Sequence, residues 1–175
     1  MVSRQAERPG ELPALPHDVT LAVEDPTFMV ATWRNVFFSM WCSAPTVAQL
    51  ETVIRIQRPM WTQHPKNVVA FSYIAKMGFS QLNISSEVRK AIDESARLTD
   101  PHARASVHLI AGQGFFLSLV RSLIAGIHIL QKAPFPLKVT DSEADAVAFL
   151  VPHVGADVGP VARAVIARYR ARMGG

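Results

Sequence analysis

Segments typical of β-strands alternate with segments typical of α-helices along most of this 175-residue chain. The strand-like segments are short, rich in β-branched and aromatic residues, and bounded by residues that favour turns. They cover Thr20–Glu24, Phe28–Arg34, Val36–Ser43, Asn67–Ile74, Arg104–Ala111 and Leu137–Thr140. Strands that alternate with helices favour parallel pairing, right-handed crossovers and helices packed on the sheet. We therefore predict an α/β fold with a mixed, mostly parallel sheet of about five or six strands.

Capping residues mark where the helices begin. The stretch TVAQ, which starts at Thr46, has the capping-box pattern and predicts a helix that Pro59 should kink or end. The stretch TDSE, which starts at Thr140, has the same pattern and predicts a helix that runs to about residue 151. Each helix follows a predicted strand, as the α/β arrangement requires.

The two ends of the chain differ from its centre. Residues 1–17 contain several prolines and no hydrophobic periodicity, which predicts a mobile tail. Residues 18–152 hold the alternating pattern and form the predicted domain. Residues 153–175 contain an extra, basic amphipathic helix, Val158–Met173. The arginines beside its apolar face are Arg163, Arg168, Arg170 and Arg172.

Composition excludes several classes of protein. Hydrophobic residues make up 49% of the chain and charged residues 18%, which is typical of a globular domain. Cys42 is the only cysteine, so we expect no disulfide framework. We identify no secretory signal and expect a cytoplasmic protein. The apolar run from Leu109 to Leu130 carries a stripe that includes Arg121 and His128, which predicts a mostly buried helix and no membrane span.

Four stretches of the chain resemble a STAS-type domain, the fold of the anti-sigma-factor antagonists of bacterial sporulation. They are FFSMWCSAPTVAQLETV, NVVAFSYI, SVHLIAGQGFFLSLVRSLIAGI and PFPLKVTDSEADAVAFL. The resemblance is to a divergent branch of uncharacterised bacterial proteins and covers roughly residues 20–152. It implies a non-catalytic regulatory module that binds another protein or a peptide.

The resemblance also implies a regulatory role for Ser85 or Ser86. In the antagonists, a serine at the start of the helix after the central strand is phosphorylated by the partner kinase, and the added negative charge switches partner binding. This chain has the longer loop KMGFSQLNISSE there and lacks the aspartate of the family's short loop. From the residues alone we favour the other interpretation, in which a serine at this position only caps the helix.

Two glycines follow the strand Arg104–Ala111, at the place where many nucleotide-binding proteins hold a phosphate. The turn Gly112-Gln113-Gly114 lacks the third glycine of a dinucleotide fingerprint, because Leu117 stands there. It also lacks the lysine of a P-loop, because aromatic residues follow Gly114. We predict a structural turn, with a weak anion site at the helix N-terminus as the alternative.

No residue pattern points to a metal, a cofactor or a catalytic set. The six histidines show no spacing typical of metal ligands, and we expect neither metal nor cofactor. His108 lies within a strand, where a histidine is more often a satisfied core residue than a ligand. Both faces of Val36–Ser43 are largely apolar, which predicts helices on both faces or a contact surface, and we favour coverage together with a contact between subunits.

These observations favour a binding module over an enzyme. The expected partner is another protein, a peptide or a second copy of the chain. The arginines of the last helix are common on docked helices, so nucleic acid is a less favoured partner. The alternative function is a small-molecule-binding protein or small enzyme that uses the cleft near Gly112–Gly114, with Arg121 and His128 on the exposed helix face.

Overall fold

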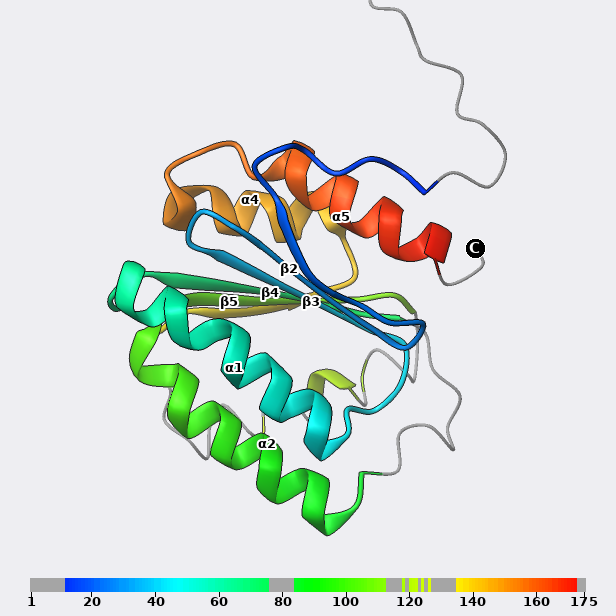
Figure 1. Ribbon diagram of the computed structural model, residues 1–175, viewed down its shortest axis with the longest axis vertical. Helices are drawn as coiled ribbons and strands as arrows, with labels where there is room; N and C mark the ends of the chain where they lie inside the picture. The colour runs from blue at the N-terminus through cyan, green and yellow to red at the C-terminus, as the bar shows by residue number, and fades with distance from the viewer. Residues whose placement is uncertain are drawn as a thin grey trace, which may run out of the picture.

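The computed structural model describes residues 12–75, 84–112, 118, 120–122, 124, 126 and 135–172. Figure 1 labels the elements by their order along the chain. The strands are β1 (Thr20–Glu24), β2 (Phe28–Trp33), β3 (Val36–Trp41), β4 (Val68–Ile74), β5 (Ala103–Ile110) and β6 (Leu137–Thr140). The helices are α1 (Val47–Gln63), α2 (Ser86–Thr99), the short 3₁₀ helix η2 (Asp100–His102), α4 (Glu143–Val154) and α5 (Gly159–Arg172).

The six described strands form one mixed sheet in sequential order, β1-β2-β3-β4-β5-β6. The pairs β1–β2 and β2–β3 are antiparallel, whereas β3–β4, β4–β5 and β5–β6 are parallel. The α/β class is confirmed, but the prediction of a mostly parallel sheet is wrong. Only Arg34 and Asn35 separate β2 from β3, and so short a link can join two strands only as an antiparallel hairpin.

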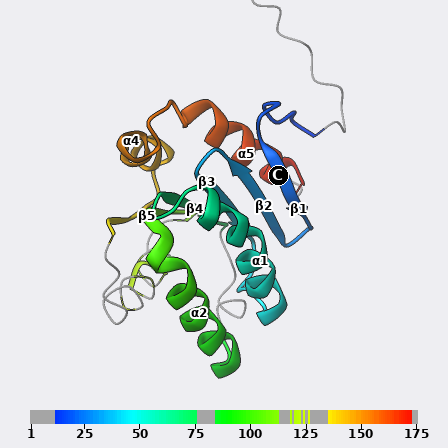
Figure 2. The same cartoon turned by 60° about the vertical axis from the view of Figure 1, so that its left-hand side comes forward.

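Helices cover both faces of the sheet (Figure 1). Helices α1 and α2 lie on one face, and α4 and α5 lie on the other (Figures 1 and 2). The connections β3-α1-β4 and β4-α2-β5 both lead to the next strand on the same side. Parallel connections of this kind are nearly always right-handed, so two in the same direction place α1 and α2 on the same face of the sheet. Helix coverage on both faces of β3, one of the two arrangements expected for its apolar faces, is therefore observed.

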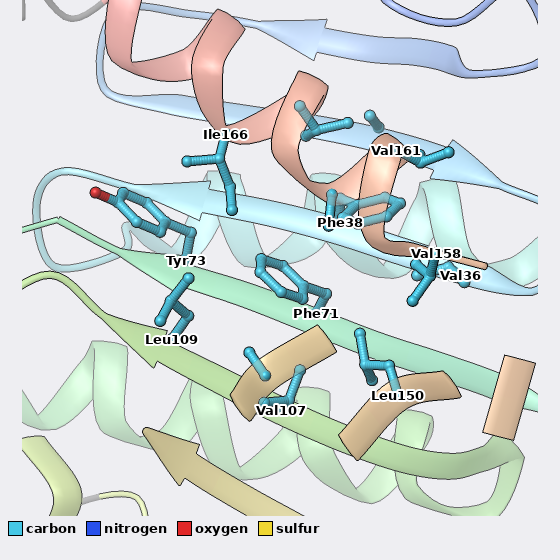
Figure 3. Packing of buried hydrophobic residues seen from close by; sticks show 14 of the residues in the cluster. Val36, Phe38, Phe71, Tyr73, Val107, Leu109, Leu150, Val158, Val161 and Ile166 are labelled. Carbon is cyan, nitrogen blue, oxygen red and sulfur yellow. The ribbon is translucent and has the colours of Figure 1, made fainter. Parts of the chain in front are cut away.

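The main core lies between the sheet and the helices α4 and α5. The register aligns Phe38 of β3 with Phe71 of β4, and Phe71 with Val107 of β5. These three side chains are fully buried, and Leu150 of α4 and Ile166 of α5 belong to the same cluster (Figure 3). Because α5 contributes to this shared core, its apolar face stabilises the sheet directly.

Two details of the predicted helices differ in the structure. Helix α1 has the capping box at Thr46 and does not end at Pro59 but continues to Gln63, where burial of Met60 against the sheet outweighs the missing backbone donor; a kink at Pro59 stays a prediction. The stretch at Thr140 is not a capping box. Ser142 caps α4 instead, and the Thr140 hydroxyl accepts a hydrogen bond from the Ser142 amide.

Residues before β1 contact the domain where the structure describes them. Leu15 packs against the main core. Arg168 of α5 donates to the backbone carbonyl of Pro13 at 3.2 Å and forms a two-pronged pair with Glu24 of β1, at 2.6 and 3.0 Å. This pair ties the C-terminal helix to the first strand.

Candidate functional site

A cavity of about 340 Å³ lies between the sheet and helices α1 and α2. Residues of β3, β4, β5 and β6 form its floor, and the helices form its walls. Val120 and Ile124, from the helical residues after β5, also line the cavity, as do residues outside the strands and the two helices, which are Ser43, Ala44, Pro45, Ile84, Asp100 and Phe135. The volume falls within the range of about 300–1,000 Å³ in which proteins hold small organic molecules.

Small side chains on this face of the sheet leave the space open. Toward α4 and α5, strands β3 and β4 direct Phe38 and Phe71, which fill the main core. Toward the cavity, the same strands direct Ser39, Ala70 and Ser72, which lie between the larger Phe37 and Trp41 of β3 and Val68 and Ile74 of β4. Successive residues of a strand point to opposite faces, so small residues in the middle of β3 and β4 leave a hollow on one face while large residues fill the other.

Polar groups form a row across the otherwise apolar floor. The register places Ser39 beside Ser72 and Ser72 beside His108, on three neighbouring parallel strands. The hydroxyl oxygens of Ser39 and Ser72 are 3.0 Å apart, and Ser106 Oγ lies 3.4 Å from His108 Nε2. These groups therefore have hydrogen-bond partners within the floor itself.

Helical spacing places the wall residues on the inner faces of their helices. Leu50, Val53, Gln57 and Trp61 of α1 recur at steps of three and four residues and all line the cavity. The second wall consists of Ile92, Ser95, Ala96 and Thr99 of α2. Small residues in this wall contribute to the space in the same way as those of the floor.

A tryptophan lies toward each end of the cavity. Trp61 lies near the start of β4 and stacks on His102, with ring centres 4.7 Å apart and an angle of 4° between the planes. Trp41 pairs with Ile74 at the end of β4 and stacks on Phe28 at 4.3 Å. The Trp61 Nε1 atom is buried and has no hydrogen-bond acceptor among the residues that the structure describes.

The predicted regulatory serines lie at the start of α2. Ser85 is exposed and caps the helix, since its hydroxyl accepts a hydrogen bond from the Val88 amide at 3.2 Å. Ser86 is the first helical residue and borders a shallow hollow beside Arg89 and Lys90. The cap is therefore observed, whereas phosphorylation of either serine stays a prediction.

The predicted ligand residues around the glycine turn are only partly described. Gly112 follows β5 and is half-buried, and Arg121 is exposed and does not line the cavity. Gln113, Gly114 and His128 lie outside the described residues. Anion binding at this turn stays a prediction.

The chemistry of the cavity favours binding. Asp100 and His108 are the titratable residues in the described lining, which contains no lysine or arginine. Ser106 and His108 are two residues apart on one strand, and Ser106 Oγ lies 3.4 Å from His108 Nε2, at the long end of hydrogen-bond distances. The arrangement can enclose an apolar molecule and offer it hydrogen bonds.

Comparison with protein-family models, with curated proteins and with solved structures finds no match for this chain. Within the described ranges, no helix is long and apolar enough to cross a membrane. The same ranges contain no group of three or more histidine, cysteine, aspartate or glutamate side chains that could hold a metal ion.

Reasoning from the sequence missed this cavity and interpreted His108 as a core residue. A signal was present in the strands, where serine or alanine at positions 39, 70 and 72 lies between larger residues. The alternation identifies a place on one face of the sheet where little side-chain volume is present. It does not identify the helices that roof this face, because the wall residues are distant in sequence.

Proposed function

We propose that this chain is a binding module that holds a small, mainly apolar molecule between its sheet and helices α1 and α2. The observation that carries the proposal is the cavity of about 340 Å³ in a region where the sheet presents serine and alanine. Well-packed protein interiors contain few voids larger than a water molecule. A bound apolar molecule would gain about 2.5 kcal/mol for each 100 Å² of apolar surface removed from water.

A fluorescence experiment tests the proposal. The neutral dye N-phenylnaphthylamine, which brightens in apolar surroundings, is titrated into the full chain and into variants Ala70→Leu and Ala96→Leu, which add bulk to the floor and to the α2 wall. We expect saturable binding to the native chain, weaker binding to each variant and the weakest binding to the double variant. Ala70→Ser is the matched control and should bind as the native chain does.

Two outcomes would contradict the proposal. One is the absence of saturable dye binding to the folded native chain. The other is equal binding by the native chain and the double variant, which would place the dye elsewhere. Mass spectrometry of the purified protein under native conditions adds a check, because a retained small molecule raises the mass of the native chain and not that of the double variant.

A second candidate function is regulated binding of a partner protein at the start of α2. Both serines are exposed, and Ser86 borders a hollow lined by Arg89, Lys90 and Asp93, where the two cations outnumber the carboxylate and would stabilise the charge of a phosphoserine. The STAS-type resemblance of the sequence supports the same candidate. Co-purification with the native chain and with Ser86→Asp would show whether a partner exists and whether the charge weakens its binding.

A further inference from the structure

The inner face of α1 carries a polar side chain into the wall of the cavity. Gln57 lies between Val53 and Trp61 on this face, lines the cavity and has only 6% of its surface exposed. Its amide offers one acceptor and two donors, and it has no hydrogen bond to the residues that the structure describes. Because nearly all buried polar groups in folded proteins have a partner, we look for one that the chain itself does not supply.

The amide of Gln57 is open to the cavity. Among the described residues, the buried polar atoms that lack both a partner and accessible surface are Trp61 Nε1 and the Tyr169 hydroxyl. The amide oxygen and nitrogen of Gln57 are not among them, so they keep accessible surface. Leu50 and Val53 of the same helix face also line the cavity, so this surface opens into it. A molecule in the cavity can therefore reach the amide.

Ser72 adds a hydrogen-bond donor on the floor. Its oxygen is 3.0 Å from Ser39 Oγ, and the geometry allows either hydroxyl to donate. Ser39 is 4% exposed and has no other hydrogen bond to the described residues, so its proton is satisfied when it donates to Ser72. Ser72 is half-buried and lines the cavity, so its own proton is available to a ligand there.

Both polar groups lie away from the ends of the cavity. Helix α1 runs from the end of β3 back to the start of β4, and Gln57 stands about 9 Å before the last residue of the helix. On the floor, Ser72 lies between Val68 and Ile74, the two ends of β4, and all three residues line the cavity. Apolar lining therefore extends along β4 on both sides of the polar floor group.

We propose that the ligand is an uncharged molecule with an amide group between two apolar parts, and that Gln57 and Ser72 bind this amide. This inference rests on the proposed function and specifies the chemical class of the ligand. An amide both accepts and donates, as the side chain of Gln57 does, and its carbonyl oxygen suits the Ser72 proton. Neither residue carries a charge, so an ionised group would lose its hydration without gaining a counter-charge from them.

Two probes of the same shape test for recognition of the amide. Benzanilide holds an amide between two phenyl rings, and trans-stilbene has a carbon–carbon double bond in its place. Each is used to displace N-phenylnaphthylamine from the full native chain and from Gln57→Met, which keeps the length of the side chain and removes its amide. We expect the substitution to weaken benzanilide binding by about two- to tenfold, as the loss of a hydrogen bond would. The affinity for trans-stilbene should not fall.

Matched variants control for changes in the fold. Gln63→Met makes the same substitution at an exposed position of α1 and should leave both affinities unchanged. Ser72→Ala should weaken benzanilide binding, whereas Ser39→Ala keeps the Ser72 proton and should not. Because Gln57 has no partner among the described residues, Gln57→Met should not lower the free energy of unfolding of the ligand-free chain, which urea unfolding measures.

A measurement on the native chain is independent of the folding of any variant. The side-chain NH₂ group of Gln57 gives a pair of signals in a proton–nitrogen NMR spectrum. Benzanilide should move one of them downfield of its position with trans-stilbene, which is the direction expected when an N–H donates a hydrogen bond. Since both probes carry the same two rings, the difference between them reports the contact with the amide.

The outcomes separate this inference from the proposed function. If the dye does not bind, or if the double variant with Ala70→Leu and Ala96→Leu binds it as the native chain does, the proposed function fails and the inference fails with it. If the dye binds in the cavity but benzanilide does not displace it, or Gln57→Met affects both probes alike, the inference alone is overturned. The same holds if Ser72→Ala leaves benzanilide binding unchanged or the Gln57 signals respond alike to both probes.

Discussion

The hydroxyl oxygens of Ser39 and Ser72 lie 3.0 Å apart on the neighbouring parallel strands β3 and β4. Ser39 is nearly fully buried, with 4% of its surface exposed, so it depends on this contact to satisfy its hydroxyl. The pair also keeps the cavity floor low, because neither side chain extends far from the sheet. One contact thus serves both the stability of the sheet and the shape of the cavity.

Removing one hydroxyl of the serine pair should lower the free energy of unfolding by more than the hydrogen bond itself contributes, because the other hydroxyl then lacks this partner. Ser39→Ala leaves Ser72 without this partner, and we expect the free energy of unfolding to fall by about 1–2 kcal/mol. The double variant Ser39→Ala/Ser72→Ala should cost less than the sum of the single variants, because it leaves no hydroxyl of the pair behind. Urea unfolding of the four proteins measures this coupling, and additivity within about 0.5 kcal/mol would show that the hydroxyls do not interact.

The pair between Glu24 and Arg168 should make stability depend on pH in the acid range. The hydrogen bond from Arg168 is the main cause that holds the pKa of Glu24 below its ordinary value of 4.5. The stabilisation is therefore complete above that value and is lost as the pH falls through the lowered pKa of the folded state. We expect Glu24→Gln to cost about 1 kcal/mol at neutral pH, since both side chains are only about one-fifth exposed.

Glu51→Gln, on the exposed side of α1, is the matched control for this substitution. Chemical unfolding of each protein at neutral and acid pH should show a gap between native chain and Glu24→Gln that closes in acid. The control should stay within about 0.5 kcal/mol of the native chain at neutral pH. A gap for Glu24→Gln that persists at low pH would assign the loss to packing rather than charge.

Because Tyr169 is buried, the free energy of unfolding should fall as the pH becomes alkaline. Tyr169 is 1% exposed, and this burial raises the pKa of its phenol above the ordinary value of 10. Stability is complete below the pKa of the unfolded chain and falls above it, because only the unfolded state then releases the proton. We expect the native chain to lose up to about 1.4 kcal/mol per pH unit above that point, and Tyr169→Phe to lose less.

Tyr73→Phe serves as the control, because it removes the other tyrosine and keeps Tyr169. It should retain the steep alkaline loss and also lose the hydrogen bond that Arg170 donates to the Tyr73 hydroxyl at 3.2 Å. Unfolding curves above pH 10 compare the three proteins. Equal slopes for the native chain and Tyr169→Phe would assign the alkaline loss to other groups.

The two serines at the start of α2 should behave differently when substituted. Ser85→Ala removes the cap on the Val88 amide and should lower stability by about 1 kcal/mol, whereas Ser85→Asp keeps an acceptor there. Ser86→Ala should change stability by less than about 0.5 kcal/mol, since Ser86 is exposed. Thermal unfolding tests the cap, and equal effects of the two alanine variants would contradict it.

Local sequence determined where most elements begin and end. The strands Thr20–Glu24 and Leu137–Thr140 lie at the predicted residues, and Thr46 caps α1 as its spacing indicates. These features depend on neighbours within a few residues, such as a threonine and glutamine three positions apart. The direction of β2 relative to β3 was also encoded locally, in a two-residue link, although the alternating pattern led us to expect mostly parallel pairing.

Tertiary packing decided the rest. Pro59 remains inside α1 because Met60 is buried against the sheet, a gain that no local pattern reports. The small residues of the strands showed that one sheet face carries little volume, but the cavity exists because α1 and α2 pack against each other above that face. The position of Trp61 next to His102 joins residues 41 positions apart, and only the folded chain brings such residues together, since side-chain contact depends on the path of the backbone between them.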